Sequence, residues 1–381
     1  YFKRFGGITD ITIDNVSVKE YLGQEVVPNS GCGSWLFEPQ STNLITYSED
    51  FSQWYTINST ILSDDAISPS GIQDADRVTA TSTGNGAFVR DTSVTQSTST
   101  TYSFSCFVKK GTTNFVRLAN RAIGGQTTAS AWFDIENGVL GTLGSDLSSS
   151  KIEDFGSGWY KCTATGATAS GAIVNQLLDI AASTSDGSTG AVIGDFMYVW
   201  GAQSEQQSYA TSYIPTEGTT KTRNQDLCTN GGDVSLINST EGVLYAEIAA
   251  FTPLASASQY ITISDGTYNN RASILLSTAF SFRVFLKIGG ASQIDINLNV
   301  ADVTDYNKIA LSYKENDFKV YINGSLVHSD INGSVWADDT ITKLSFSEIN
   351  TSGGLFNGKT KCVAVFKEAL SDTELTELTT I

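Results

Sequence analysis

The chain has 381 residues, of which 40% are hydrophobic and 17% are charged, and its formal net charge at pH 7 is −17. At about 150 residues per domain, this length predicts two domains or more, each long enough to bury a core. The acidic charge would repel nucleic acid and anionic membranes, and no apolar run approaches the roughly 20 residues of a transmembrane helix. We therefore expect neither nucleic-acid binding nor membrane insertion.

The first predicted strand lies in residues 1–22, before a stretch with the composition of a linker. Apolar and polar residues alternate between Ile8 and Tyr21, which is typical of a strand with one buried face. We expect residues 1–22 to hold the terminal strand of an upstream β-domain. Residues 23–34 are rich in Gly, Pro, Asn and Ser, which predicts a linker before a new module.

Residues 35–226 show the alternation of a module built from strands. One face of the stretch from Thr101 to Lys110 is apolar, and Asn137-Gly138 is the two-residue signal of a β-hairpin. Near the end of the module, three aromatic residues share one face of a predicted strand, which favours a large aromatic layer in the core of a sandwich. These residues are Phe196, Tyr198 and Trp200.

Residues 227–240 lose the alternation and predict a second linker, after which residues 241–381 resume the strands. Closely spaced hairpin turns indicate antiparallel sheets. Ser371-Asp372-Thr373-Glu374 fits a capping box and predicts a short terminal helix. The predicted fold is all-β, with tandem antiparallel β-sandwiches and one short C-terminal helix. The turns in the second module are predicted at Asp265-Gly266, Gly289-Gly290, Glu315 to Asp317 and Asn323-Gly324.

Two parts of the chain resemble known families. Ile309–Val327, with a Tyr-x-Asn-Gly hairpin, and Phe356–Leu375, with a Leu-Ser-x-x-Glu turn, are similar to the closing strands of the concanavalin A-like, laminin-G-like sandwich. Leu36–Trp54 and Met197–Asp226 resemble the first and last segments of a carbohydrate-binding-type jelly-roll module of bacteriophage virion proteins. The resemblances imply a jelly roll over residues 35–226 and a concanavalin A-like domain over residues 241–381.

These resemblances imply a phage virion surface protein, such as a fibre, a spike or a head decoration, that attaches to the host without enzymatic activity. Its expected partners are host-surface glycans and other virion proteins, and its expected location is the virion surface or the extracellular medium. By analogy with such appendages we expect a homo-oligomer, taken as a trimer, in which weak sites act together. Two alternatives stay open: a purely structural capsid or tail component, and a secreted bacterial protein that binds or degrades polysaccharide.

Residues that could carry catalysis are sparse. His328 is the one histidine of the sequence, and no sequence feature identifies partners for a nucleophilic triad. Glycoside hydrolysis needs two carboxylates about 5–10 Å apart, and Glu247 stands alone on the strand that resembles the acidic strand of concanavalin A-like hydrolases. By the resemblance to the jelly-roll module, Glu38, Glu49 and Asp50 are expected at turns and on the surface rather than as catalysts.

Aromatic residues outside the alternating strands are candidates for stacking on sugars, with neighbouring amides as hydrogen-bonding groups. For each of them a packed loop aromatic is the alternative, because Trp is heavily buried on average. The candidate glycan-binding residues are Trp54, Tyr55, Tyr268, Asn269, Asn270 and Trp336.

Calcium binding stays open, since oxygen ligands can converge without a linear motif. Asp74, Asp76 and Asp265 are the candidate ligands, although each can equally cap a turn. The five cysteines include no C-x-x-C pair, which gives no support for a zinc or redox motif. Cys32 and Cys228 bracket the first module, so a disulfide between them is one hypothesis and free thiols are the other.

Overall fold

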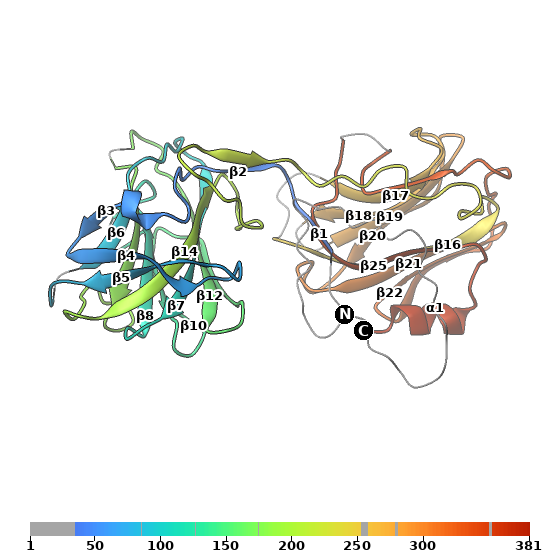
Figure 1. Ribbon diagram of the computed structural model, residues 1–381. Coiled ribbons are helices and arrows are strands. Elements are labelled where there is room, and N and C mark those ends of the chain that lie inside the picture. The colour runs from blue at the N-terminus through green and yellow to red at the C-terminus, as the bar shows by residue number, and fades with distance from the viewer. Residues whose placement is uncertain are drawn as a thin grey trace, which may run out of the picture.

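The computed structural model describes residues 35–84, 86–125, 127–173, 175–252, 258–278, 281–349 and 353–381. It contains two β-sandwiches joined by a narrow connection that includes β2 (Ser41–Asn43) (Figure 1). The strands pair antiparallel and one short α-helix lies near the C-terminus, so the all-β prediction is confirmed. No helix in these residues is long and apolar enough to span a bilayer. The predicted strand in residues 1–22, the predicted linker at 23–34 and Cys32 lie outside the described residues.

The first sandwich packs two sheets, each with six strands in the described part of the chain. The first sheet runs in spatial order through β10 (Val139–Leu143), β9 (Ser130–Asp134), β8 (Phe115–Asn120), β13 (Leu178–Ser183), β6 (Ala87–Asp91) and β3 (Tyr55–Ile57). The second runs through β11 (Ser149–Asp154), β12 (Trp159–Ala167), β7 (Thr101–Lys110), β14 (Phe196–Glu205), β5 (Gln73–Ala80) and β4 (Ser59–Ile67).

The core of this sandwich lies between the two sheets. Phe104, Cys106 and Val108 point into it from β7, as the alternation predicts. Val116 and Leu118 of β8 face them from the first sheet. Because side chains alternate along a strand, the residues between these positions form the outer face of each sheet.

The predicted aromatic core layer on β14 is wrong. Met197 and Val199 fill the core, whereas Phe196, Tyr198 and Trp200 lie on the outer face of the strand. Both faces of β14 are apolar, since the outer face carries a second aromatic cluster in which Trp200 is buried. Alternation alone therefore does not tell which face meets the core.

The second sandwich has one sheet of six strands and one of five in the described residues. The larger sheet runs through β1 (Trp35–Phe37), β25 (Gly358–Phe366), β16 (Glu241–Ala250), β21 (Asn307–Lys314), β22 (Asp317–Ile322) and β23 (Ser325–Asp330). The smaller sheet runs through β20 (Ala291–Asn299), β19 (Ser281–Ile288), β18 (Arg271–Thr278), β17 (Gln259–Ser264) and β24 (Lys343–Ser345).

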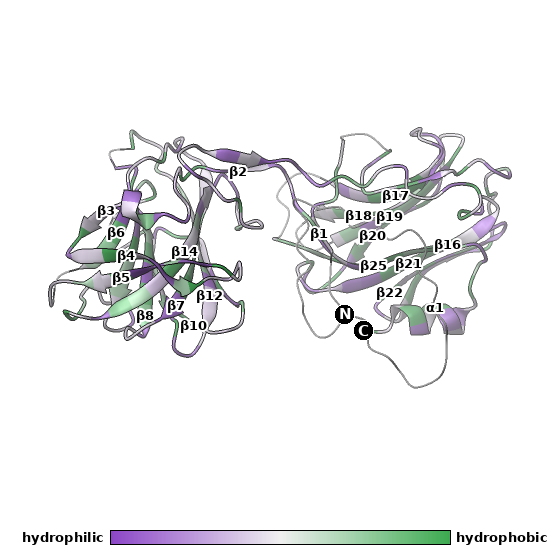
Figure 2. Cartoon of the chain, in the orientation of Figure 1, coloured by the Kyte–Doolittle hydropathy of each residue, from purple (hydrophilic) through white to green (hydrophobic). Residues whose placement is uncertain are grey.

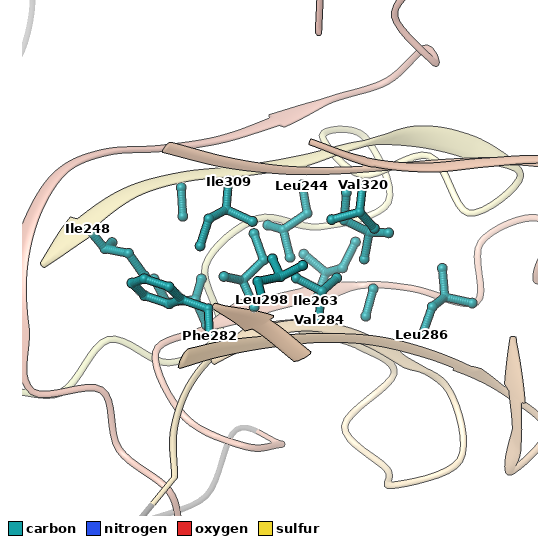
Figure 3. Close-up of a cluster of buried hydrophobic side chains, with 14 of the residues drawn as sticks. Leu244, Ile248, Ile263, Phe282, Val284, Leu286, Leu298, Ile309 and Val320 are labelled. Atoms are coloured by element: carbon teal, nitrogen blue, oxygen red, sulfur yellow. The ribbon is translucent and has the colours of Figure 1, made fainter. Parts of the chain in front are cut away.

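A core of aliphatic and aromatic side chains separates these two sheets. Figure 3 shows Leu244, Ile309 and Val320 pointing down from the larger sheet, toward Phe282 and Val284 of the smaller one. The strands are greener than the loops in Figure 2, and β2 in the connection is hydrophilic. The hydrophobic residues thus form a separate core in each sandwich.

The short turns of the second sandwich follow the sequence. Gly289 and Gly290 form the two-residue turn between β19 and β20, and Asn323 and Gly324 form the turn between β22 and β23. All four residues have a positive φ, as a type I′ hairpin requires. In the first sandwich, Asp134 pairs with Val139, so the connection at Asn137-Gly138 has four residues and not the predicted two.

The terminal helix α1 (Asp372–Thr379) has the predicted capping box. The Ser371 hydroxyl accepts a hydrogen bond from the Glu374 amide (3.4 Å), and the Glu374 carboxylate accepts one from the Ser371 amide (2.8 Å). Leu375 is buried beside Val243 of the larger sheet. Reciprocal capping and one apolar contact therefore position this helix.

The first sandwich is inserted into the second. Trp35–Phe37 pair with Gly358–Thr360 of β25, so β1 belongs to the second sandwich rather than to the module that the sequence predicts to begin there. The chain then crosses to the first sandwich through β2 and returns through β15 (Lys221–Arg223), and these two strands pair as an antiparallel ribbon. The predicted boundary at residue 35 is corrected because strand pairing is a long-range choice that local composition does not show.

A buried polar network braces this ribbon. Arg223 lies 3.2 Å from the Glu38 carboxylate and 3.6 Å from that of Asp226, and Glu38 also accepts a hydrogen bond from the Ser212 amide (2.8 Å). Burial raises the pKa of Glu38, while Arg223 and Ser212 oppose the rise. Glu38 is therefore a buried residue of the connection and not the surface residue that was expected.

The other two acids of this region behave as predicted or nearly so. Asp50 is exposed and caps the 3-10 helix η1 (Phe51–Gln53) by accepting a hydrogen bond from the Ser52 amide (3.0 Å). Glu49 is half-buried and accepts a hydrogen bond from the Tyr213 hydroxyl (2.9 Å). Asp50 therefore caps a local turn, and Glu49 links two segments that are distant in the sequence.

Candidate glycan-binding surfaces

The structure separates the predicted aromatic candidates into buried and exposed rings. Trp54 is 5% exposed and donates its indole N–H to the Tyr47 carbonyl (2.8 Å). Trp336 is 3% exposed and donates to the Lys287 carbonyl (2.9 Å). Neither ring has a free face for a sugar, so the prediction that Trp54 and Trp336 stack on glycans is wrong. Each of them holds a loop onto its sandwich.

Tyr268 is the exposed aromatic candidate of the second sandwich, at 52% exposure. It lies in the loop between β17 and β18, which is closed by a hydrogen bond from the Asn270 amide group to the Asp265 carboxylate (2.8 Å). Asn270 also accepts from the Gly289 amide (2.8 Å), and the Gly290 amide donates to the Asn269 carbonyl (2.9 Å). The loop is thus tied to the neighbouring hairpin turn.

A stack of side chains supports the Tyr268 ring from one side. The Arg271 guanidinium lies 5.1 Å from the centre of the Tyr268 ring and 4.6 Å from that of Phe285. Glu348 holds Arg271 with a 3.0 Å ion pair. Guanidinium groups interact favourably with aromatic rings at distances up to about 6 Å, so Arg271 supports one side of the Tyr268 ring. We call Tyr268, Asn269, Arg271, Phe285 and Glu348 the Tyr268 surface.

Asn269 is exposed beside Tyr268, whereas the Asn270 side chain is used within the loop. Tyr268 and Asn269 are therefore both available to a ligand. Asn270 has a structural role instead. Sequence reasoning missed Arg271, although it follows directly in the sequence. A positively charged residue that follows a loop aromatic at the start of a predicted strand could have pointed to Arg271.

Tyr55 is the exposed candidate of the first sandwich, at 62% exposure. It pairs across β3 and β6 with Arg90, which in turn pairs with Asp179 of β13. Tyr55 and Trp54 are adjacent in sequence and face opposite ways, because successive side chains of an extended chain point to opposite sides. Arg90 and Asp179 were not singled out by the sequence analysis.

The calcium candidates accept hydrogen bonds from the protein itself. Asp76 is buried and accepts from the backbone amides of Phe51 (2.9 Å) and Asp64 (3.0 Å). Asp74 accepts from the Ser70 hydroxyl (3.3 Å). Burial raises the pKa of Asp265, but hydrogen bonds from Asn270 and Thr267 outweigh it and hold the pKa below its usual value. Across the described ranges, no group of three or more His, Cys, Asp or Glu is placed to hold a metal ion.

We predict that Asp76 makes the stability of the first sandwich depend on pH. Burial raises the pKa of Asp76 to about 6, above the ordinary 3.8, against hydrogen bonds from two backbone amides. The folded protein then binds a proton more tightly than the unfolded chain, so stability rises as the pH falls from 7 to 4. Relative to Asp76→Asn, the wild type should gain about 2–3 kcal/mol over this range in urea unfolding. A constant difference between the two proteins would contradict this assignment.

The two groups considered for catalysis lie far apart in the sheet. Glu247 of β16 lies opposite Lys308 and Cys362, and its carboxylate is 3.6 Å from the Lys361 ammonium. His328 is half-buried within β23, opposite Val320. The structure therefore does not bring Glu247 and His328 together.

Four cysteines are described, and they are free thiols. Cys106 and Cys162 are buried in the first core, Cys228 packs against the second core, and Cys362 is exposed. The predicted pairing of Cys228 with Cys32 involves a residue outside the described part of the chain.

The fold places the second sandwich in a known class. Residues 248–376 match a family described as the concanavalin A-like lectin/glucanases superfamily, laminin-G type 3. The chain therefore contains a concanavalin A-like, laminin-G-like domain, as its closing strands indicate. No curated protein matches the chain by sequence.

Several solved structures are similar to part of this chain at low identity. The carbohydrate-binding module CBM40 of the Ruminococcus gnavus IT-sialidase, bound to α2,3-sialyllactose, is 15% identical with a TM-score of 0.33, and the match covers 40% of this chain and 93% of that chain. A heptameric SAP-like pentraxin of Limulus polyphemus is 14% identical with a TM-score of 0.31, covering 39% and 72%. The binding domain of botulinum neurotoxin serotype G is 15% identical with a TM-score of 0.31, covering 39% of each chain.

Proposed function

We propose that this chain is a non-enzymatic surface component of a phage virion, such as a fibre, a spike or a head decoration, that binds glycans of the host surface. The observation that carries the binding proposal is the Tyr268 surface. It presents an aromatic ring that is more than half exposed on a loop fixed by Asn270 and braced by Arg271. An immobilised ring loses little conformational entropy when a sugar stacks on it.

The domain class supports the glycan partner, because the family matched by residues 248–376 includes lectins. The virion setting rests on the resemblance of residues 35–226 to jelly-roll modules of phage proteins. A site with one exposed ring, such as the Tyr268 surface, binds a glycan weakly by itself. Several copies in an oligomer on one particle would raise the effective affinity by 10²–10⁴ without any new contact.

We predict that Tyr268→Ala weakens glycan binding about tenfold. Loss of a stacking ring costs on the order of 1–1.5 kcal/mol, and 1.4 kcal/mol is a tenfold change. A glycan array with the full chain selects the ligand, and titration calorimetry then compares the variants. Tyr268→Phe keeps the ring and should bind like the wild type, as should Phe155→Ala, which removes an exposed aromatic of the first sandwich.

Two results would contradict the proposal. If the folded chain binds no glycan or host cell even when it is multivalent, the binding role fails. If antibodies against the chain label disrupted phage particles but not intact ones, the location on the virion surface fails.

A further inference from the structure

The outer face of the first sheet in the first sandwich gathers three arginines around one carboxylate. Arg117 and Arg121 lie on the same side of β8 and its extension, because Val116 and Leu118 point into the core. Ala119 stands between them, and Asp179 lies directly opposite Ala119 on the neighbouring strand. Arg90 lies opposite Asp179 on its other side. We call Tyr55, Arg90, Arg117, Arg121 and Asp179 the arginine face.

Asp179 is shared between these arginines. Arg90 forms a two-pronged contact with it, at 2.6 Å from Nε and 2.9 Å from Nη2, and Arg121 approaches it to 3.9 Å. The Asp179 side chain is fully buried, whereas those of Arg90 and Arg121 are 17% and 20% exposed. The carboxylate is therefore covered by guanidinium groups that reach solvent.

The arginine face carries more positive than negative charge. In the described part of the chain, Asp179 is the one carboxylate within ion-pairing distance of Arg90 or Arg121. Burial lowers the pKa of Arg117, Asp179 opposes this, and Arg121 and Arg90 lower the pKa further. Arginine stays protonated in proteins, so Arg90 and Arg121 bring two positive charges to the one negative charge of Asp179.

This clustering of arginines is unusual in an acidic chain. Three of the four arginines between residues 44 and 220 lie on this one face, while the net charge of the chain is −17. Stability alone does not account for it, because like charges close together in a partly buried site repel one another. The exposed parts of the Arg90 and Arg121 side chains can meet an anion bound at the surface, which would supply the missing negative charge.

Tyr55 adds an exposed aromatic ring to the arginine face. Its ring is exposed and lies opposite Arg90, on the side away from Asp179. The row from Tyr55 through Arg90 to Asp179 crosses two strand spacings, or about 10 Å, and Arg121 approaches Asp179 to 3.9 Å. A ligand that contacts both Tyr55 and Arg121 must therefore be longer than one sugar ring.

We propose that the arginine face is a binding site for an acidic oligosaccharide, in which Tyr55 stacks on one sugar ring while Arg90 and Arg121 bind a carboxylate or sulfate group of the next. Guanidinium N–H groups form charge-assisted hydrogen bonds with either anion, and Nη1 of Arg90 is not used by Asp179. This inference rests on the proposed function, since it names the glycan class for one sandwich. It is independent of the Tyr268 surface.

The test is titration calorimetry of the full chain with three ligands: trigalacturonic acid, its methyl ester, and a chondroitin sulfate tetrasaccharide. We expect binding of at least one anionic ligand, no binding of the uncharged ester, and an affinity that falls as sodium chloride is raised. Which of the two anions binds distinguishes a carboxylate from a sulfate as the recognised group.

The variants locate the site. Arg121→Gln should lower the affinity tenfold or more, since it removes a charge while leaving the Arg90–Asp179 pair intact. Arg77→Gln is the matched control, because it removes one arginine from the opposite sheet of the same sandwich, and it should bind like the wild type. Tyr55→Ala should weaken binding and Tyr55→Phe should not. Amide hydrogen exchange of β8 checks that each variant is folded.

Three results would overturn this inference. They are equal binding of trigalacturonic acid and its ester, equal affinity of Arg121→Gln and wild type, and no binding of either anion by the folded chain. If neutral glycans bind at the Tyr268 surface and neither anion binds the folded chain, the proposed function survives while the arginine face fails. If no glycan of any charge binds, both fail.

Discussion

Asp179→Asn is expected to cost the first sandwich about 3–5 kcal/mol of its free energy of unfolding. The side chain is fully buried and neutralises Arg90 at 2.6 Å. Asparagine fills the same volume but carries no charge, so Arg90 and Arg121 would lose the carboxylate that they share. Removing one partner of a buried ion pair is costly because the remaining charge stays out of water.

The second sandwich provides a matched control for this substitution. Arg283 and Asp295 make the same two-pronged contact, at 2.6 and 2.7 Å, but both side chains are 41% exposed. Water screens this pair, so Asp295→Asn should cost no more than about 1 kcal/mol. Urea unfolding followed by hydrogen exchange of peptides from β13 and β19 reports the two sandwiches separately. Equal costs for the two variants would show that Asp179 is not held in a low-dielectric site.

Met197→Ala is expected to cost the first sandwich about 2–5 kcal/mol, and Phe196→Ala no more than about 1 kcal/mol. Met197 is fully buried in the core, so its truncation leaves a cavity between the two sheets. Phe196 lies on the outer face, where its ring meets Tyr198 and the Arg77 guanidinium (5.4 Å). The larger residue should therefore matter less.

This pair of variants tests the register of β14 directly. If the strand were shifted by one residue, every side chain would change faces and the order of the two effects would reverse. Thermal unfolding monitored by near-ultraviolet circular dichroism measures both variants. A larger loss for Phe196→Ala than for Met197→Ala would restore the aromatic core layer that the sequence suggests.

Local features of this protein could be predicted from sequence. Gly289-Gly290 and Asn323-Gly324 occur as turns because these residues tolerate the positive φ of a type I′ hairpin. Ser371 and Glu374 cap α1 because both hydrogen bonds lie within one turn of the chain. In each case the residues that determine the structure are neighbours in the sequence.

The burial of the aromatic candidates could not be predicted from the sequence. Trp54 and Tyr55 are adjacent polar-loop aromatics, yet one is buried and the other exposed. The difference depends on the Tyr47 carbonyl, which accepts the indole N–H of Trp54. Likewise Trp336 is buried against Lys287, which is distant in the sequence. Composition cannot rank such residues, because burial is decided by partners from other segments.

By itself, the sequence determined that the chain is all-β and that strands turn at Gly289-Gly290 and Asn323-Gly324. Only the tertiary structure decided that β1 completes the second sandwich and that Asp179 lies between Arg90 and the strand that holds Arg117. The physical reason is that periodicity along a strand is a local property. The choice of the neighbouring strand is a competition among all strands of the chain for the same backbone hydrogen bonds and the same core.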